Sequence, residues 1–196
     1  MKLMSFFFTR GTISFLIAFV VFSLIRTNFF KKLKKKSNPK REFTMSVFVG
    51  YIASISLFLF MPNVYLASKG VDLTSENFDF VGDFKDRIVQ GGWGINLVPF
   101  KTIKSYLKYS EAFHAALNIL GNVLIFVPMG FMLPLLYEDL RSYKKTLIFT
   151  MIICMLVETI QFFVGRSVDI DDLMLNVVGA SIGYLVYKIK GKLFLT

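Results

Sequence analysis

Residues 11–30 read GTISFLIAFVVFSLIRTNFF, an apolar run that is long enough to cross a membrane as a helix. The hydrocarbon core of a bilayer is about 30 Å thick, so a spanning helix needs about 20 apolar residues. A cleaved signal peptide is the alternative, but its apolar core would be shorter and a small-residue cleavage site would follow it. We therefore expect a retained transmembrane helix, with Arg26 near one end reaching out to the interface.

Four further apolar runs follow along the chain, at about residues 43–66, 112–137, 145–164 and 171–187. The 196 residues are 55% hydrophobic and 18% charged, whereas soluble domains carry about 25% charged residues. Lipid must therefore solvate much of the surface. The sequence predicts an all-α, polytopic membrane protein of about five transmembrane helices, folded as a single membrane domain over residues 1–196.

The net charge of +10 is distributed as expected for a membrane protein. Residues 31–41, KKLKKKSNPKR, form a dense basic loop after the first span, and no nucleic-acid-binding motif occurs. If that loop is cytoplasmic, thirteen Lys and Arg residues lie inside and nine outside, and six acids match the six positive residues of the loop at 67–111. The positive-inside rule then predicts an outer N-terminus and a cytoplasmic C-terminus, with membrane lipid rather than nucleic acid as the partner.

The chain has one cysteine, Cys154, and one histidine, His114. A single cysteine excludes an intrachain disulfide and a cysteine metal cluster. One histidine leaves too few of the usual ligands for a zinc site, and no cofactor motif occurs. We therefore expect neither a metal nor a cofactor, and we place Cys154 in the core.

The loop at 67–111, predicted to lie outside, has an amphipathic pattern. In residues 78–93 large apolar side chains are interleaved with charged ones. Further on, Ile103, Tyr106 and Leu107 recur at helical spacing beside three lysines. Both stretches fit short amphipathic helices that lie flat at the outer interface, and an ordinary structured loop is the alternative.

Polar side chains gather on one face of each of the last three spans. A charged carboxylate at the centre of a span costs about 2.5–3.5 kcal/mol on insertion scales, so such groups normally face protein or water. The helical rise places them in the outer half of the predicted bundle, where an outward-opening polar cleft would satisfy them. The candidate substrate-binding residues are Asn118, Asn122, Glu158, Gln161, Arg166, Asp169, Asp172 and Asn176.

Structural roles are the alternative for several of these side chains. Asparagines in a span can bond across helices, and Asp169 and Asp172 can cap the first turn of the last span. Glu158 can form a buried pair with Arg166. The GASIG motif at 179–183 is a GxxxG pattern, which is typical of close helix packing. Each alternative predicts a contact within the bundle in place of a ligand.

Four motifs follow one another in the second half of the chain: NLVPF (96–100), NVLIFVPMG (122–130), ETIQ (158–161) and RSVDIDDLMLNVVGASIG (166–183). In this order and at these spacings, the chain resembles the VanZ-like proteins, small membrane proteins associated with resistance to glycopeptide antibiotics such as teicoplanin. The resemblance implies an envelope role on the outer face of a bacterial cytoplasmic membrane. It gives no role to Asp171. The matched site positions are Asn122, Glu158, Gln161, Arg166, Asp169, Asp172 and Asn176.

Three hypotheses for the function follow. The favoured one is a non-enzymatic protein that binds or handles an envelope lipid or amphipathic ligand, such as a lipid-linked cell-wall precursor or a glycopeptide, in the outer cleft. Arg166 would meet phosphate or carboxylate, and the acids would meet an amine. The second is a membrane-embedded enzyme acting on a lipid-linked substrate, although no nucleophile–base pair stands out and no catalytic residue is predicted. The third is a partner-binding structural protein with the loop at 67–111 as its contact surface.

Overall fold

The computed structural model describes residues 2–35, 37–60, 95–109, 112–163 and 168–191. Long apolar runs form long helices because every backbone N–H and C=O then bonds within its own segment. The elements in chain order are α1 (Lys2–Asn28), α2 (Lys31–Lys35), α3 (Pro39–Phe60), β1 (Ile95–Asn96), α6 (Lys101–Tyr109), α7 (Ala112–Leu136), the 3₁₀ turn η1 (Glu138–Leu140), α8 (Tyr143–Phe163), β2 (Val168–Asp169) and α9 (Ile170–Lys190).

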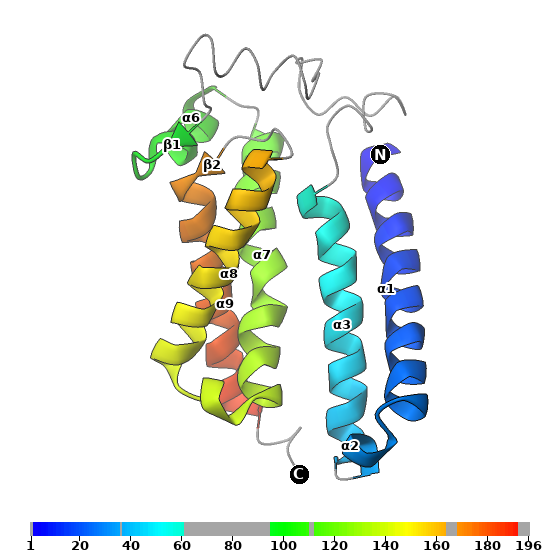
Figure 1. Cartoon of the computed structure of the whole chain (residues 1–196). Helices are drawn as coiled ribbons and strands as arrows, with labels where there is room; N and C mark the ends of the chain where they lie inside the picture. Colours follow the sequence, from blue (N-terminus) through cyan, green and yellow to red (C-terminus); the bar gives the residue numbers. More distant parts are fainter. Residues whose placement is uncertain (1, 36, 61–94, 110–111, 164–167, 192–196) are drawn as a thin grey trace.

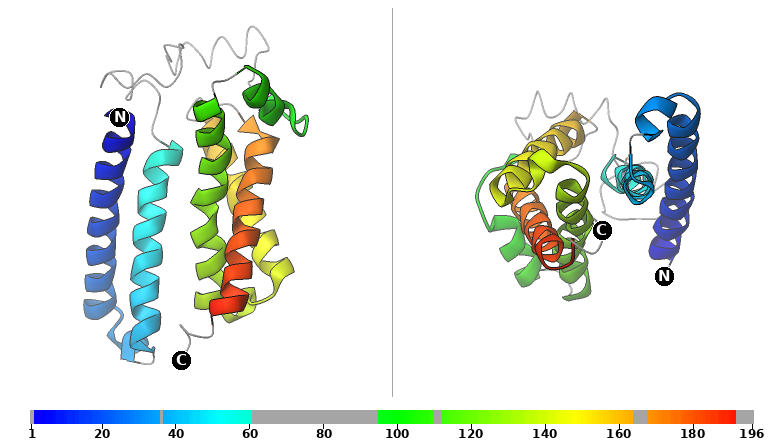
Figure 2. Two further views of the ribbon diagram at one scale, coloured as in Figure 1. Left: turned by 180° about the vertical axis from the view of Figure 1, so that it is seen from behind. Right: turned by 90° about the horizontal axis from the view of Figure 1, so that it is seen from below.

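The long helices stand side by side in two groups (Figure 1). α1 and α3 are antiparallel and joined by the short α2, and we call this pair the hairpin. α7, α8 and α9 form a three-helix bundle, in which α7 and α9 lie against each other (Figure 2). β1, β2 and α6 lie at the end of the molecule that holds the N-terminus, which we call the β end. α2, η1 and the end of α9 lie at the opposite end, the α2 end (Figure 1).

Among the described residues, four helical segments are long and apolar enough to cross a membrane: Phe8–Asn28, Asn118–Leu136, Tyr143–Phe163 and Ile170–Lys190. The protein is therefore an all-α, multi-pass membrane protein, as predicted. The span expected at 43–66 lies in α3 as far as Phe60, and its remainder falls outside the described residues. The count of five spans stays a prediction.

The two polar connections of the predicted topology are partly helical. The basic loop expected at 31–41 contains α2, and its last residues form the first turn of α3. In the loop expected at 67–111, the amphipathic helix around Ile103 is confirmed as α6. The stretch at 78–93 lies outside the described residues.

Glycine holds α7 and α9 close together, as the GxxxG pattern predicted. A Cβ atom built on Gly179 would lie 2.0 Å from the carbonyl oxygen of Val123, and one on Gly183 would lie 2.0 Å from that of Val127. From the other side, a Cβ on Gly130 would lie 2.0 Å from the carbonyl oxygen of Ala180. No side chain fits between these backbones, so the absence of a Cβ sets the spacing of the two helices.

The hairpin meets the bundle through an apolar core and a few hydrogen bonds. Ile55 of α3 packs with Phe126 and with Cys154, which is fully buried. Tyr51 donates its hydroxyl hydrogen to the carbonyl oxygen of Ile125 at 2.5 Å. This contact anchors the middle of α3 to α7, and the prediction that Cys154 belongs to the core is confirmed.

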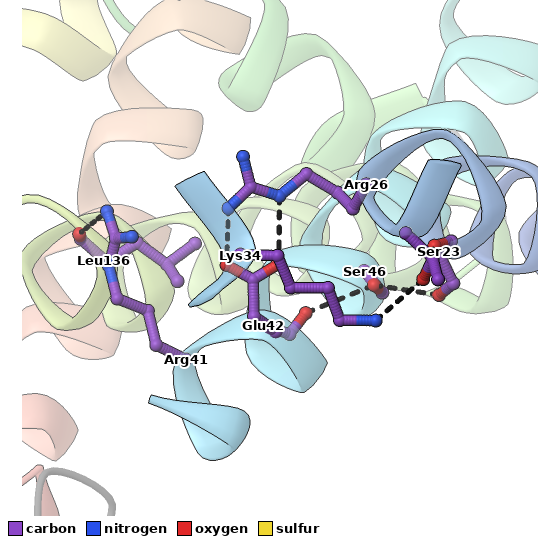
Figure 3. A network of polar contacts seen from close by, with 8 residues as sticks. Ser23, Arg26, Lys34, Arg41, Glu42, Ser46 and Leu136 are labelled. Carbon is purple, nitrogen blue, oxygen red and sulfur yellow. Dashed lines mark hydrogen bonds and ion pairs between the residues drawn. The ribbon is translucent and has the colours of Figure 1, made fainter. Parts of the chain in front are cut away.

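Arg26 does not reach out to the interface as expected, because it finds a partner inside the hairpin. Its guanidinium donates to both carboxylate oxygens of Glu42, with the Nε–Oε2 distance at 2.8 Å (Figure 3). Both residues are buried, and the hydroxyl of Ser23 donates to that of Ser46 beside them. The expectation failed because Glu42 lies in the first turn of α3, beside the last turn of α1. Pairing with Glu42 avoids the cost of burying either charge alone.

Candidate functional site

The sequence-predicted site lies at the β end, where the last turns of α8 meet β2 and the start of α9. Two contacts join helices there, one of the kind predicted for the span asparagines and one that was not predicted. Asn122 of α7 donates through Nδ2 to Oδ1 of Asp172 on α9 at 2.5 Å. The backbone N–H of Asp169 donates to Oε2 of Glu158 on α8 at 3.2 Å. Three helices of the bundle therefore supply polar groups to one region.

Glu158 and Gln161 of α8 are both 6% exposed, but they face different neighbours. Glu158 accepts the hydrogen bond from the start of α9. Gln161 donates through Nε2 to the carbonyl oxygen of Leu59 on α3, at 3.0 Å. Gln161 thus ties the hairpin to the bundle, whereas Glu158 belongs to the polar cluster.

Asp169 is the N-cap of α9, as the structural alternative predicted. Its backbone is extended, with φ −133° and ψ 121°, and its side chain accepts from the N–H of Asp171 at 2.9 Å. The same carboxylate accepts from Nδ2 of Asn96 at 3.0 Å and from the hydroxyl of Thr102. A residue predicted to bind a ligand therefore connects α9 to the segment around β1.

Asp171 is fully buried and was not identified from the sequence. Its carboxylate accepts hydrogen bonds from the backbone N–H groups of Phe100 at 2.5 Å, Thr102 at 2.8 Å and Ile103 at 3.1 Å. These are N–H groups at the start of α6 that have no partner within the helix. Asp171 therefore acts as an N-terminal cap supplied from another helix.

The sequence shows that α6 starts without a cap of its own, but not which residue supplies one. α6 has no acid in its first turn and is preceded by Pro99 and Phe100, neither of which has a side chain that can cap a helix. Phe100 also has a positive φ of 64°, which is unfavourable for an aromatic residue. A helix start of this kind needs an acceptor from elsewhere, and Asp171 points away from the stripe of Asp169 and Asp172.

β1 and β2 join the first and last sequence motifs into one structure. They pair in parallel, with Ile95 opposite Val168 and Asn96 opposite Asp169. Oδ1 of Asn96 accepts from the N–H of Val98 at 3.2 Å, and its Nδ2 donates to the hydroxyl of Thr102 at 3.0 Å. The NLVPF segment and α6 are thereby fixed on the start of α9. We call the side chains that form this network the β-end cluster: Asn96, Thr102, Asn122, Glu158, Asp169, Asp171 and Asp172.

The other predicted site residues lie at its margin or outside the described part of the chain. Asn176 is 4% exposed, one turn beyond Asp172, and its Oδ1 has no hydrogen-bond partner among the described residues. Asn118 lies one turn before Asn122 and is exposed. Arg166 lies outside the described residues, so its predicted pairing with Glu158 stays a prediction.

The chemistry of the β-end cluster is dominated by hydrogen-bond acceptors. Glu158, Asp169 and Asp172 bring three carboxylates to one end of two neighbouring helices, and Asn176 adds a buried amide oxygen. Ionised carboxylates accept hydrogen bonds and attract cations. Among the described side chains, this arrangement favours a group that donates hydrogen bonds, such as an ammonium.

Fold and site together define a multi-pass α-helical membrane protein with a carboxylate-rich cluster at one end of a three-helix bundle. The family model described as VanZ/LLP1 matches residues 48–191, which include most of α3 and the whole bundle. The chain belongs to this family. The match leaves out α1, α2 and the first turns of α3. No curated protein and no solved structure was found to match the chain.

Proposed function

We propose that the protein contributes to resistance to glycopeptide antibiotics of the teicoplanin type by binding an envelope lipid or another amphipathic ligand at the β-end cluster. Membership of the VanZ/LLP1 family supports the envelope role. The observation that carries the binding role is the position of Glu158, a carboxylate 6% exposed in a helix apolar enough to span a membrane. Carboxylates are rare there and normally serve a function.

The proposed orientation places the β end outside a bacterial cytoplasmic membrane and the C-terminus inside. Basic side chains collect at the α2 end, which supports this orientation through the positive-inside rule. They come from α2, from the connection between α7 and α8, and from the end of α9. These residues are Lys31, Lys32, Lys34, Lys35, Arg141, Lys144, Lys145, Lys188 and Lys190.

The acceptor-rich cluster defines the part of the ligand that would bind. An ammonium or a set of amide N–H groups could donate to Glu158, to Asp172 and to Oδ1 of Asn176, which has no hydrogen-bond partner among the described residues. The apolar part of the ligand would then lie against the exposed apolar side chains of the bundle, such as Leu124, which is 63% exposed. A ligand with a polar, amine-bearing head and an apolar tail fits both surfaces.

Replacing Glu158 by Gln, and Asp172 by Asn, tests this function. Each change removes a charge and keeps the shape of the side chain. We expect both variants to reach the membrane at normal levels and to lose most of the teicoplanin resistance conferred by the wild-type chain. Glu138→Gln is the matched control, because the Glu138 side chain is 82% exposed at the α2 end. Full resistance in the Glu158 and Asp172 variants would contradict the proposal.

A partner-binding role is a second candidate, favoured by the surface of β1 and α6. Leu97 is 69% exposed, Val98 59% and Leu107 70%, beside the exposed Lys101 and Lys104. If this surface binds a cell-wall protein, changing Leu97 and Leu107 to Ser should abolish co-purification of that protein, whereas Glu158→Gln should not. The opposite pattern would favour the ligand-binding function.

A further inference from the structure

The α2 end holds a second polar site, separate from the β-end cluster. A pocket of about 600 Å³ lies between the start of α3 and the turn that joins α7 to α8. Lys40 and Arg41 line it from the hairpin, and Tyr137, Glu138 and Arg141 line it from the bundle. The pocket therefore lies at the boundary between the hairpin and the bundle. At this boundary, α3 is the helix of the hairpin that contacts the bundle.

The three basic side chains that line this pocket differ in whether they form a salt bridge with an acidic side chain. Arg141 pairs with Glu138 at 3.0 Å, although both side chains are exposed. Arg41 donates through Nη2 to the carbonyl oxygen of Leu136 at a long 3.4 Å (Figure 3). Lys40 is exposed and forms no salt bridge with any described residue. Lys40 and Arg41 thus line the pocket without forming a salt bridge to any described residue, although Arg41 lies close enough to Glu42 to interact with its carboxylate electrostatically.

The first turn of α3 adds to this positive character. The helix starts at Pro39, and Oδ1 of Asn38 accepts from the N–H of Lys40 at 2.9 Å. Lys40 and Arg41 lie in that first turn, where the helix dipole is positive and phosphate groups bind favourably. The charge of the side chains and the dipole of a 22-residue helix therefore act at the same place.

The buried pair of the hairpin fixes this first turn in place. Arg26 holds Glu42, the residue next to Arg41, from the side of α1 (Figure 3). A smaller pocket of about 310 Å³ lies on that side and is lined by Arg26, Glu42 and Lys34. Arg26 and Glu42 satisfy each other, and Lys34 donates to the hydroxyl of Thr27, whereas Lys40 and Arg41 both line the larger pocket.

We propose that the larger pocket binds the headgroup of an anionic phospholipid from the leaflet next to the α2 end. Lys40 and Arg41 would bind the phosphate, and Glu138 and the neighbouring Asp139 would accept hydrogen bonds from headgroup hydroxyls. The dense basic stretch around α2 attracts anionic lipid to this surface. Leu135 and Leu136 of α7 line the same pocket and give its wall an apolar part. This site is independent of the function proposed for the β end.

Native mass spectrometry of the purified full chain tests the lipid site. Phosphatidylglycerol, phosphatidylethanolamine and phosphatidylcholine are titrated against wild type and against Lys40→Gln/Arg41→Gln. The control is Lys31→Gln/Lys32→Gln, which removes the same charge from exposed positions on α2 that do not line the pocket. We expect phosphatidylglycerol to bind best, the pocket variant to bind it at least about tenfold more weakly, and the control to stay within about twofold of wild type.

Three outcomes would overturn the proposal. Equal losses in the pocket variant and the control would show diffuse attraction to a charged surface rather than a site. Preference for phosphatidylethanolamine would exclude an anionic headgroup. Displacement of the lipid by millimolar inorganic phosphate or glycerol phosphate would assign the pocket to a soluble phosphate compound. Equal melting temperatures for the three proteins ensure that a loss of binding reflects the pocket and not unfolding.

Discussion

At the scale of single residues, Asp171 connects two segments that are far apart in the sequence. Its carboxylate is fully buried and accepts three backbone N–H groups at the start of α6. A carboxylate has two acceptor oxygens, whereas an amide has one and adds an N–H₂ group that would meet these donors. Asp171 is therefore suited to hold α6 in a way that Asn is not.

Changing Asp171 to Asn should loosen α6 and leave the bundle folded. We expect a cost of about 1–3 kcal/mol, which is the usual effect of leaving buried donors unsatisfied. Hydrogen–deuterium exchange should be faster for the amides of α6 and unchanged for those of α7. Asp139→Asn is the control, since Asp139 is exposed on η1. Slow exchange of α6 in the Asp171 variant would contradict the capping role.

Helical periodicity in the sequence identifies some residues of the site but not others. Asp172 and Asn176 lie on one stripe of a helix, and this spacing marked Asp172 as a residue that faces the bundle, where it accepts from Asn122. Asp171 lies off that stripe, and its partner is the backbone of Phe100, which carries no side-chain signal of polarity. Contacts to backbone groups of distant segments depend on tertiary structure, so a pattern on one helix cannot reveal them.

At the scale of elements, the close contact between α7 and α9 depends on glycines, which have no side chain to separate the two backbones. A Cβ on Gly183 would lie 2.0 Å from the carbonyl oxygen of Val127. The sequence indicated this contact through the GxxxG pattern, because the pattern is local to one helix. It could not identify Gly130 as part of the same contact, since Gly130 meets Ala180 only when the two helices pack.

Gly183→Ala should force α7 and α9 apart and destabilise the bundle. The clash is with backbone, which cannot move aside as a flexible side chain would, so we expect a loss of at least about 1–3 kcal/mol. Gly121→Ala is a matched control on α7, because a Cβ there meets nothing within 4 Å. Thermal unfolding of both variants in the same detergent measures the difference. Equal melting temperatures would mean that the helices are not held this closely.

The hairpin should depend on pH through Glu42. Hydrogen bonding to Arg26 lowers the pKa of the Glu42 carboxyl below its ordinary value of 4.5. A lowered pKa means that the pair stabilises the hairpin above pH 4.5 and that this contribution is lost as pH falls through the lowered pKa. Unfolding measured between neutral pH and about pH 3 should therefore show this loss in wild type but not in Glu42→Gln. A Glu42→Gln variant with the same acid dependence as wild type would exclude Glu42 as its source.

At the scale of the whole molecule, the hairpin and the bundle are distinct parts. The family match begins at residue 48, within α3, so it excludes the Arg26–Glu42 pair and both residues that carry the free charge of the lipid pocket. The β-end cluster, in contrast, lies entirely within the matched residues. The bundle thus carries the features expected of the family, and the hairpin adds a basic surface at the opposite end.

The two ends should face opposite sides of the membrane, and cysteine labelling can show which end is outside. The native Cys154 is fully buried in the core, so it should give little background. Lys104→Cys places a thiol on exposed α6 at the β end, and Lys35→Cys places one on exposed α2. In intact cells, a membrane-impermeant maleimide should label the Lys104→Cys thiol at once and the Lys35→Cys thiol only after permeabilisation. The reverse order of labelling would show that the β end faces the cytoplasm. The carboxylate cluster would then lie on the cytoplasmic side, which would contradict an outward-facing ligand site.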